Sequence, residues 1–155
     1  PNGRIPLLQL PDGRFLAESN AILCYLAEGT ELMPVDPYER AQLLSWLFFE
    51  QYSHEPYIAV MRFWRKLLGM TPEREAQAEA KMAAGYAALD VMEKRLAAHD
   101  WLVGDSYSIA DIALYAYTHM ADEGGFTLDG YPGLRAWLDR VSAIPRYIPI
   151  TQVLG

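Results

Sequence analysis

Residues 29–36 separate two parts of the chain that differ in hydrophobic periodicity, and this break constrains the architecture most. Before it, short apolar runs alternate with turn residues, which is typical of extended chain. After it, apolar residues recur mostly at spacings of three and four, which is typical of helices. The sequence of 155 residues has room for such a division. We therefore predict one part over residues 1–29, a linker over 30–36 and an all-helical part over 37–155.

The residue pattern of the first part predicts a β-hairpin followed by one helix. Residues 7–10 form a short apolar run, residues 11–14 place Pro and Gly where a tight turn uses them, and the extended pattern resumes at 15–17. Ser19 is the expected N-cap of a helix of about three turns, and Gly29 is its stop signal. The expected fold class is therefore mostly α with a small α/β part.

The second part predicts four or five helices. Pro37 starts the first one, and Pro56 interrupts it by removing the hydrogen bond to the carbonyl of Tyr52. A long amphipathic helix starts near Pro72, and Pro132 opens the last helix. These signals predict an all-helical domain.

Ser108 and Asp111 give the sharpest local signal in the chain, because their spacing is that of a capping box. The Ser108 hydroxyl can accept from a helical amide while the Asp111 carboxylate reaches back to the Ser108 amide. A serine and an aspartate this close resemble catalytic partners, but the spacing already satisfies a helix start. We therefore assign both residues to structural capping.

Charge and cysteine content exclude several classes of partner. The 13 Lys and Arg against 20 Asp and Glu give a net charge of −7, which repels phosphate backbones and anionic lipids, so we expect no nucleic-acid or membrane partner. No apolar run approaches the ~18 residues of a membrane span.

Cys24 is the one cysteine, which excludes an intramolecular disulfide and fits the reducing cytoplasm. His54, His99 and His119 lack ligand spacing, so no metal is expected.

Two short segments of the first part suit the charged end of a peptide. Pro6 lacks an amide at the entry to a strand, which leaves the backbone edge at Ile5 free to pair with an extended ligand. Glu18 and Ser19 stand at a helix start, where amides, a hydroxyl and the helix dipole hold a carboxylate and the Glu18 side chain takes an ammonium. Capping alone also explains Ser19, so both interpretations stay open at this point.

The aromatic residues near Pro56 are candidates for an apolar ligand site. If their helix faces the first part of the chain, Tyr52, His54 and Tyr57 line a pocket there. The alternative is structural: the aromatic residues belong to the core and His54 is a partly exposed histidine. Cys24 similarly fits a small buried hydrophobic residue better than a reactive thiolate.

Four segments, taken in their order and spacing, carry a family resemblance. They are Asn2-Gly3-Arg4-Ile5-Pro6-Leu7-Leu8, Leu16-Ala17-Glu18-Ser19-Asn20-Ala21-Ile22, Gly104-Asp105-Ser106-Tyr107-Ser108-Ile109-Ala110-Asp111 and Tyr131-Pro132-Gly133-Leu134. The first two resemble the second half of the thioredoxin-like domain of cytosolic glutathione S-transferases of the bacterial type. The last two resemble the C-terminal domain of that superfamily. The resemblance implies a partial thioredoxin-like domain, a hairpin plus a helix, followed by an all-α C-terminal domain.

The resemblance also implies that the first part of the chain binds glutathione. Ile5 would pair its backbone with the cysteinyl part, and Pro6 would be a cis proline. Ser19 would hold the γ-glutamyl carboxylate and Glu18 its amine, while Arg4 would reach the glycyl carboxylate. Glutathione would then be the co-substrate of a small hydrophobic electrophile, which the aromatic candidates near Pro56 would face.

One segment of the family pattern has no counterpart in this sequence. Family members begin with a strand, a helix and a second strand, which carry the Tyr, Ser or Cys that activates the thiol. We therefore expect the activating residue upstream of Pro1. A trimmed start is the favoured explanation, because a sheet without its central strands is costly to keep folded.

Three functional interpretations follow. The leading one is a glutathione transferase that conjugates the glutathione thiol to small apolar electrophiles, as in detoxification. The second is a non-catalytic binding or dimerisation module of the same fold, and the third is a helical bundle with a hairpin appendage. A homodimer is expected from the family analogy and from residues 43–49, of which only Ser45 is not apolar.

Overall fold

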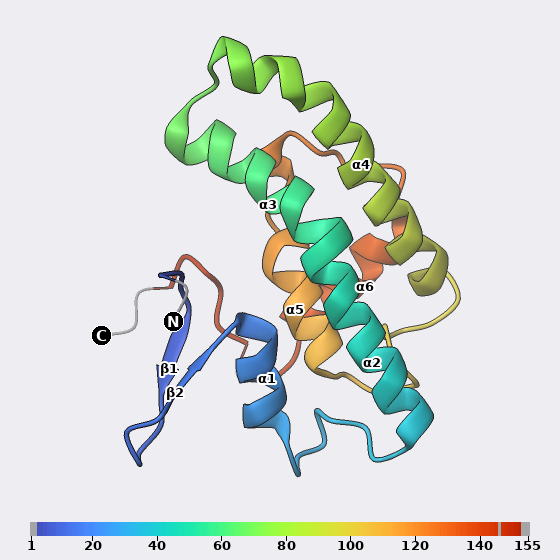
Figure 1. Cartoon of the computed structure of the whole chain (residues 1–155). Coiled ribbons are helices and arrows are strands. Elements are labelled where there is room, and N and C mark those ends of the chain that lie inside the picture. The colour runs from blue at the N-terminus through green and yellow to red at the C-terminus, as the bar shows by residue number, and fades with distance from the viewer. Residues whose placement is uncertain (1–2, 146, 153–155) are drawn as a thin grey trace.

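The computed structural model describes residues 3–145 and 147–152, and it places a β-hairpin and one helix beside a bundle of longer helices (Figure 1). The elements in chain order are β1 (Leu7–Gln9), β2 (Phe15–Ala17), α1 (Ser19–Ala27), α2 (Pro37–Phe49), η1 (Glu50–His54), α3 (Glu55–Phe63), η2 (Trp64–Leu68), α4 (Pro72–Leu96), α5 (Ile109–Thr118), η3 (Ala121–Gly124) and α6 (Pro132–Ser142). The outer ends of the two predicted parts, residues 1–2 and 153–155, lie outside the described residues. The linker boundaries at 30–36 stay a prediction.

β1 and β2 form the predicted hairpin. The strands pair antiparallel, with Leu8 opposite Leu16. Gly13 has a φ of +87°, a conformation that costs glycine little, and its amide donates to the Leu10 carbonyl at 2.9 Å to close the turn. Together with the helices that follow, this small sheet confirms the predicted fold class.

The N-cap predicted for α1 is wrong by one residue. Glu18 occupies the N-cap position, and its φ of 71° lies in the left-handed region. Because the chain turns from β2 into α1 at Glu18, Ser19 already has a helical backbone, and within the described part of the chain no side-chain hydrogen bond caps this helix. A non-glycine residue held in this region costs roughly 1–3 kcal/mol, and such residues cluster at functional sites.

The elements α2, η1, α3 and η2 follow one another as an almost continuous helical rod (Figure 1). η1 is a π-helical turn in which the Glu55 amide donates to the Glu50 carbonyl, five residues back. The interruption predicted at Pro56 is therefore a change of helical pitch, after which Pro56 stands in the first turn of α3, where its missing amide costs least. Within residues 3–145 and 147–152, none of the helices combines the length and the hydrophobicity that a membrane-spanning helix needs.

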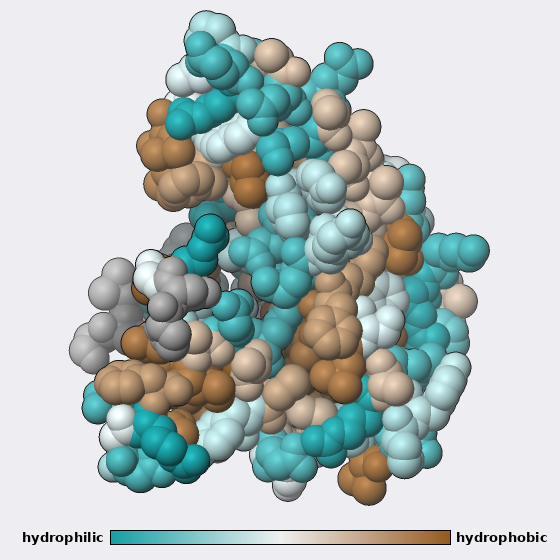
Figure 2. Space-filling view, viewed as in Figure 1, coloured by the Kyte–Doolittle hydropathy of each residue, from teal (hydrophilic) through white to brown (hydrophobic). Residues whose placement is uncertain are grey.

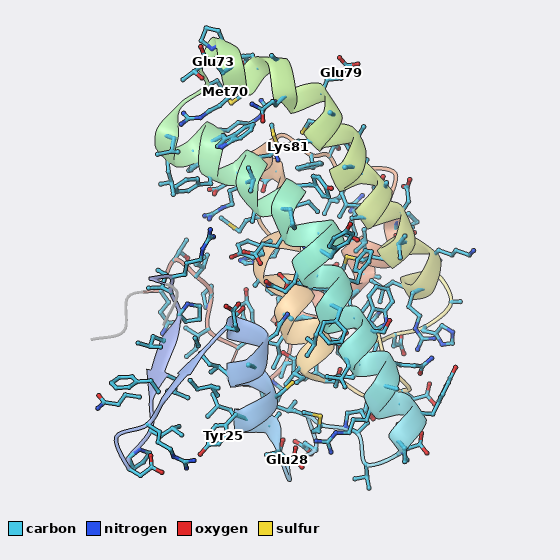
Figure 3. The ribbon with its side chains drawn as sticks, viewed as in Figure 1. Tyr25, Glu28, Met70, Glu73, Glu79 and Lys81 are labelled. Atoms are coloured by element: carbon cyan, nitrogen blue, oxygen red, sulfur yellow. The ribbon has the colours of Figure 1, made fainter. Side chains whose placement is uncertain are left out.

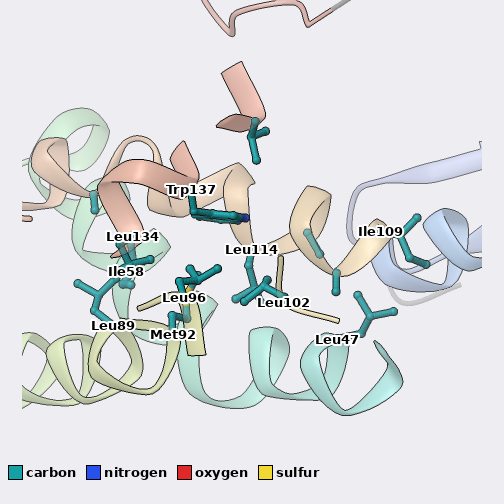
Figure 4. Close-up of a cluster of buried hydrophobic side chains, with 14 of the residues drawn as sticks. Leu47, Ile58, Leu89, Met92, Leu96, Leu102, Ile109, Leu114, Leu134 and Trp137 are labelled. Atoms are coloured by element: carbon teal, nitrogen blue, oxygen red, sulfur yellow. The ribbon is translucent and has the colours of Figure 1, made fainter. Parts of the chain in front are cut away.

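The core lies where α4 packs against the rod and α6. Leu89, Met92 and Leu96 of α4 are buried, as the amphipathic spacing predicts. Figure 4 shows these side chains beside Leu134 and Trp137 of α6. Apolar burial along α4 therefore contributes to the stability of the bundle.

The buried carboxylate of Asp111 connects three segments of this core. The structure contains the capping box of Ser108 and Asp111 at the start of α5. Asp111 Oδ1 accepts from Trp137 Nε1 at 2.9 Å and from the Leu102 amide at 3.1 Å. Its Oδ2 accepts from the Ser108 amide at 3.0 Å and from the Ser108 hydroxyl at 3.2 Å. Burial raises the pKa of Asp111, while these hydrogen bonds act in the opposite direction.

The start of α6 depends on α4. The Glu93 carboxylate of α4 accepts from the amides of Gly133 and Leu134 at 3.0 and 2.8 Å, which satisfies donors that the first turn of α6 leaves unpaired. A Cβ atom at Gly133 would lie 2.7 Å from the Ala97 nitrogen and 2.8 Å from the Leu96 carbonyl carbon. Only glycine therefore lets α6 begin this close to the end of α4.

Candidate functional site

One pocket of about 190 Å³ lies between the N-terminal segment and the rod. Eight residues line it: Arg4, Ile5, Pro6, Glu18, Ser19, Gln51, Glu55 and Tyr117. We call it the N-terminal pocket. All five residues that the sequence assigns to glutathione lie around it, although they come from two separate stretches of the chain.

The Ile5 side of the N-terminal pocket is an open backbone edge. The Ile5–Pro6 peptide bond is cis, as the resemblance implies. Ile5 as a whole residue is 95% exposed, so its backbone lies at the surface and not in the core. Ile5 precedes β1, and its backbone takes no part in the pairing of β1 with β2, so it suits pairing with an extended peptide.

The α1 side of the pocket suits an anion beside a cation. The first backbone hydrogen bond of α1 runs from the Ile22 amide to the Glu18 carbonyl, so the amides before Ile22 have no acceptor within the helix. These amides, the helix dipole and the Ser19 hydroxyl together favour a carboxylate. The adjacent Glu18 carboxylate favours an ammonium, so this end of the pocket is complementary to a zwitterion.

A hydrogen-bonded network crosses from α1 to the rod behind the pocket. Asn20 Nδ2 donates to Glu50 Oε2 at 2.9 Å and to the Leu47 carbonyl at 3.0 Å. Gln51 Nε2 donates to Glu50 Oε2 at 2.8 Å and to Glu55 Oε2 at 2.6 Å. Glu50 is 3% exposed, and burial raises the pKa of its carboxyl group. The network thereby fixes α1 against η1, where the two parts of the chain meet.

Gln51, Glu55 and Tyr117 form what we call the polar wall of the N-terminal pocket. Burial is the main cause that raises the pKa of Tyr117, and the charges of Glu55 and Glu50 add to it, as does a hydrogen bond with Glu55. The phenol therefore stays protonated at neutral pH. Sequence reasoning missed all three residues, because only the packing of α5 against η1 and α3 brings them together.

The three residues predicted for an electrophile do not line this pocket. Tyr52 is 84% exposed, and His54 is 0% exposed. Tyr57 is half-buried and faces Lys81 of α4, whose Nζ lies 5.6 Å from the centre of the Tyr57 ring and points toward α3 in Figure 3. The structure does not bring the three side chains together.

His54 is the clearest departure from prediction. The expectation of a partly exposed histidine is wrong, and a ring this deeply buried cannot face an electrophile. Its Nε2 lies 2.8 Å from the Thr118 hydroxyl, and burial lowers the pKa of His54 to about 4. The reason is the π-helical turn, which ends at His54 and sends its ring toward α5.

A second cavity, of about 320 Å³, lies between α1 and α2 and is mostly apolar. Ala21, Cys24, Leu44 and Phe48 are among the residues that line it. Burial raises the pKa of the Cys24 thiol, which fits a packing role.

Among the described residues, no group of three or more His, Cys, Asp or Glu side chains is placed to hold a metal ion.

Comparison with known proteins agrees with this geometry. Residues 44–145 match the family model of the glutathione S-transferase C-terminal domain. The chain is 56% identical to a crystallised glutathione S-transferase from Pseudomonas fluorescens, with a TM-score of 0.95 over 97% of this chain and 75% of that one. It is 30% identical to a glutathione transferase from Burkholderia graminis crystallised with two glutathione molecules per subunit, with a TM-score of 0.79 over 93% of this chain and 65% of that one.

Curated relatives extend the same likeness. The disulfide-bond oxidoreductase YfcG of Escherichia coli (strain K12) is 32% identical over 94% of this chain and 70% of YfcG. The chain spans between 65% and 70% of the length of the first four curated relatives that it matches. Because the family model covers well over half of the chain and the whole fold matches solved members, the chain belongs to the glutathione S-transferase superfamily.

Proposed function

We propose that this protein is a glutathione transferase that joins the glutathione thiol to small apolar electrophiles. One observation carries the proposal: a backbone edge, a helix N-terminus and a carboxylate converge on a single pocket. Glutathione is an extended tripeptide with an ammonium and a carboxylate at its γ-glutamyl end, so its groups are complementary to this pocket. The bound glutathione of the Burkholderia graminis relative supports the same assignment.

Each residue of the N-terminal segment has a role in this proposal. The Ile5 backbone, set by Pro6, pairs with the cysteinyl residue of glutathione. Ser19 and the amides of α1 hold the γ-glutamyl carboxylate, Glu18 takes the ammonium, and Arg4 takes the glycyl carboxylate. Because both glutathione and this chain are net anionic, with −7 for the chain, affinity depends on these local groups and not on long-range attraction.

The proposed reaction is a nucleophilic substitution. The thiol loses its proton, the thiolate sulfur forms a bond to the electrophilic carbon, and the leaving group departs with the electron pair of its broken bond. The described residues then supply binding and orientation, which can contribute several kcal/mol, roughly 7–11 at best, to lowering a bimolecular barrier.

Retention on immobilised glutathione, combined with turnover of a model aryl halide, tests the proposal. Retention with turnover supports a transferase. Retention without turnover, when the product of the complete reading frame is assayed, favours the non-catalytic binding or dimerisation module. Because YfcG is a disulfide-bond oxidoreductase, a parallel assay with glutathione and a model disulfide shows whether the thiolate attacks sulfur instead of carbon. Failure of the protein to bind glutathione would reject both the transferase and the glutathione-binding module.

Replacing Ser19 with alanine should weaken glutathione binding by roughly 1–3 kcal/mol, because a donor to a charged carboxylate is lost. Isothermal titration calorimetry measures the change. Ser106→Ala is the matched control, because Ser106 is exposed and distant from the N-terminal pocket. If Ser19→Ala bound as tightly as Ser106→Ala, the role of Ser19 would be excluded.

We also propose a cytoplasmic homodimer. Leu44, Phe48 and Tyr52 are exposed at four-residue steps along α2 and η1, and Figure 2 shows apolar atoms gathered along α2. Such a stripe beside an apolar cavity suits a second copy of the chain, with about 1,200–2,000 Å² buried. Light scattering at micromolar concentration should give twice the monomer mass, and a monomer would contradict the proposal. The single cysteine supports a reducing compartment.

A further inference from the structure

A buried hydrogen bond between His54 and Thr118 lies directly behind the polar wall. Both residues are 0% exposed, and His54 Nε2 lies 2.8 Å from Thr118 Oγ1. The Thr118 hydroxyl donates its single hydrogen to the Leu114 carbonyl at 2.7 Å. Its oxygen therefore accepts from His54, which assigns the proton of the neutral imidazole to Nε2.

Burying the His54–Thr118 pair costs free energy that two apolar side chains would not. With the proton on Nε2, His54 Nδ1 is an acceptor, and it is buried with no hydrogen-bond partner among the described residues. Burying a polar atom without a partner is unfavourable, and two apolar side chains would fill the same space without that cost. A directional hydrogen bond, however, fixes the relative placement of two helices in a way that apolar contact does not.

The residues adjacent to the pair belong to the polar wall. His54 ends η1 and directly precedes Glu55, while Thr118 ends α5 and directly follows Tyr117. Both Glu55 and Tyr117 line the N-terminal pocket. Any slip of α5 along the rod would therefore separate the two sides of the polar wall.

We propose that the hydrogen bond between His54 and Thr118 positions the polar wall of the N-terminal pocket. Both are then positioning residues, since neither lines the pocket itself. The inference deepens the proposed function and rests on it: glutathione affinity depends on a contact that lies outside the ligand site. The wall is joined to the α1 side of the pocket, because Gln51 and Asn20 both donate to the Glu50 carboxylate. A displaced wall should therefore also disturb Ser19, the neighbour of Asn20, and with it the proposed carboxylate site.

Isosteric and conservative variants of the full chain test the proposal. Thr118→Val keeps the shape of the side chain and removes the acceptor, while Thr118→Ser keeps the hydroxyl. His54→Leu removes the donor, while His54→Gln can return an N–H near the place of Nε2. Val141→Ala is the control for stability alone, because Val141 is buried in α6 and does not line the pocket.

Two readouts separate positioning from simple destabilisation. Calorimetry should show glutathione affinity reduced about tenfold in Thr118→Val, restored to within about twofold in Thr118→Ser, and unchanged in Val141→Ala. The side-chain amide resonance of Gln51, which reports its hydrogen bonds to Glu50 and Glu55, should shift in Thr118→Val and His54→Leu but not in Val141→Ala. His54→Gln should lie between wild type and His54→Leu in both readouts.

The outcomes distinguish this inference from the proposed function. If the wild-type chain does not bind glutathione, the proposed function fails, and the Gln51 resonance alone decides the inference. If Thr118→Val binds glutathione like wild type and leaves the Gln51 resonance in place, the positioning role is excluded while the proposed function stands. Equal losses of glutathione affinity in Thr118→Val and Val141→Ala would also exclude the positioning role and leave the His54–Thr118 pair a purely structural one.

Discussion

Replacing Asp111 with alanine is expected to lower the free energy of unfolding by about 3–7 kcal/mol. The substitution leaves the Trp137 Nε1–H and the Leu102 amide buried without an acceptor, and it removes half of the capping box of α5. Each unpaired buried donor costs roughly 1–3 kcal/mol, and loss of the cap adds about 1 kcal/mol. Urea denaturation followed by circular dichroism measures the change.

Two further variants make the Asp111 result specific. Asp111→Asn keeps an oxygen for Trp137 and Leu102 but replaces the acceptor for the Ser108 amide with a donor, so it should lose less than Asp111→Ala. Asp105→Ala, at an exposed residue in the preceding loop, should stay within about 0.5 kcal/mol of wild type. A loss below about 1 kcal/mol in Asp111→Ala would contradict the account of the core.

The second large effect is a loss of stability in acid that comes from His54. In the native protein burial lowers its pKa to about 4, against an ordinary value of 6.5. Between these two values the unfolded chain binds a proton on His54 and the native state does not, so unfolding becomes more favourable as the pH falls. At about 1.4 kcal/mol per pH unit, His54 alone removes about 3 kcal/mol between pH 6.5 and pH 4.

Comparison of the wild type with His54→Gln isolates this contribution. The free energy of unfolding should fall less steeply with acid in His54→Gln, because glutamine has no proton to gain. His99→Gln is the control: His99 is exposed, and this variant should follow the wild-type curve. Curves for His54→Gln and wild type that stay parallel from pH 7 to pH 4.5 would show that His54 is not buried as the structure has it.

Local sequence signals predicted most of the fold. The turn at Gly13, the capping box at Ser108 and Asp111 and the helix start at Pro132 each depend on residues close in the chain, so their patterns suffice. The cap of α1 failed because the backbone of Glu18 turns in the left-handed region. That conformation is set by how the chain passes from β2 into α1, and residue preferences alone do not predict it.

The candidate site divides in the same way. Ile5, Pro6, Glu18 and Ser19 were predicted to share one site, and they line one pocket. Each stands at a strand entry or a helix start, where the backbone itself offers binding groups. Gln51, Glu55 and Tyr117 were missed, since they meet only when α5 packs against η1 and α3. His54 was misplaced because its neighbours indicate an exposed helix face, whereas the π-helical turn before Pro56 rotates its ring into the core.

The most direct test of the account is a crystal structure of this chain soaked with glutathione. The account predicts the tripeptide in the N-terminal pocket, with its γ-glutamyl carboxylate at the first amides of α1 beside Ser19. Its ammonium should lie near Glu18, and its cysteinyl backbone should pair with Ile5. A pocket that stays empty at saturating glutathione, or a tripeptide bound elsewhere on the chain, would contradict the account.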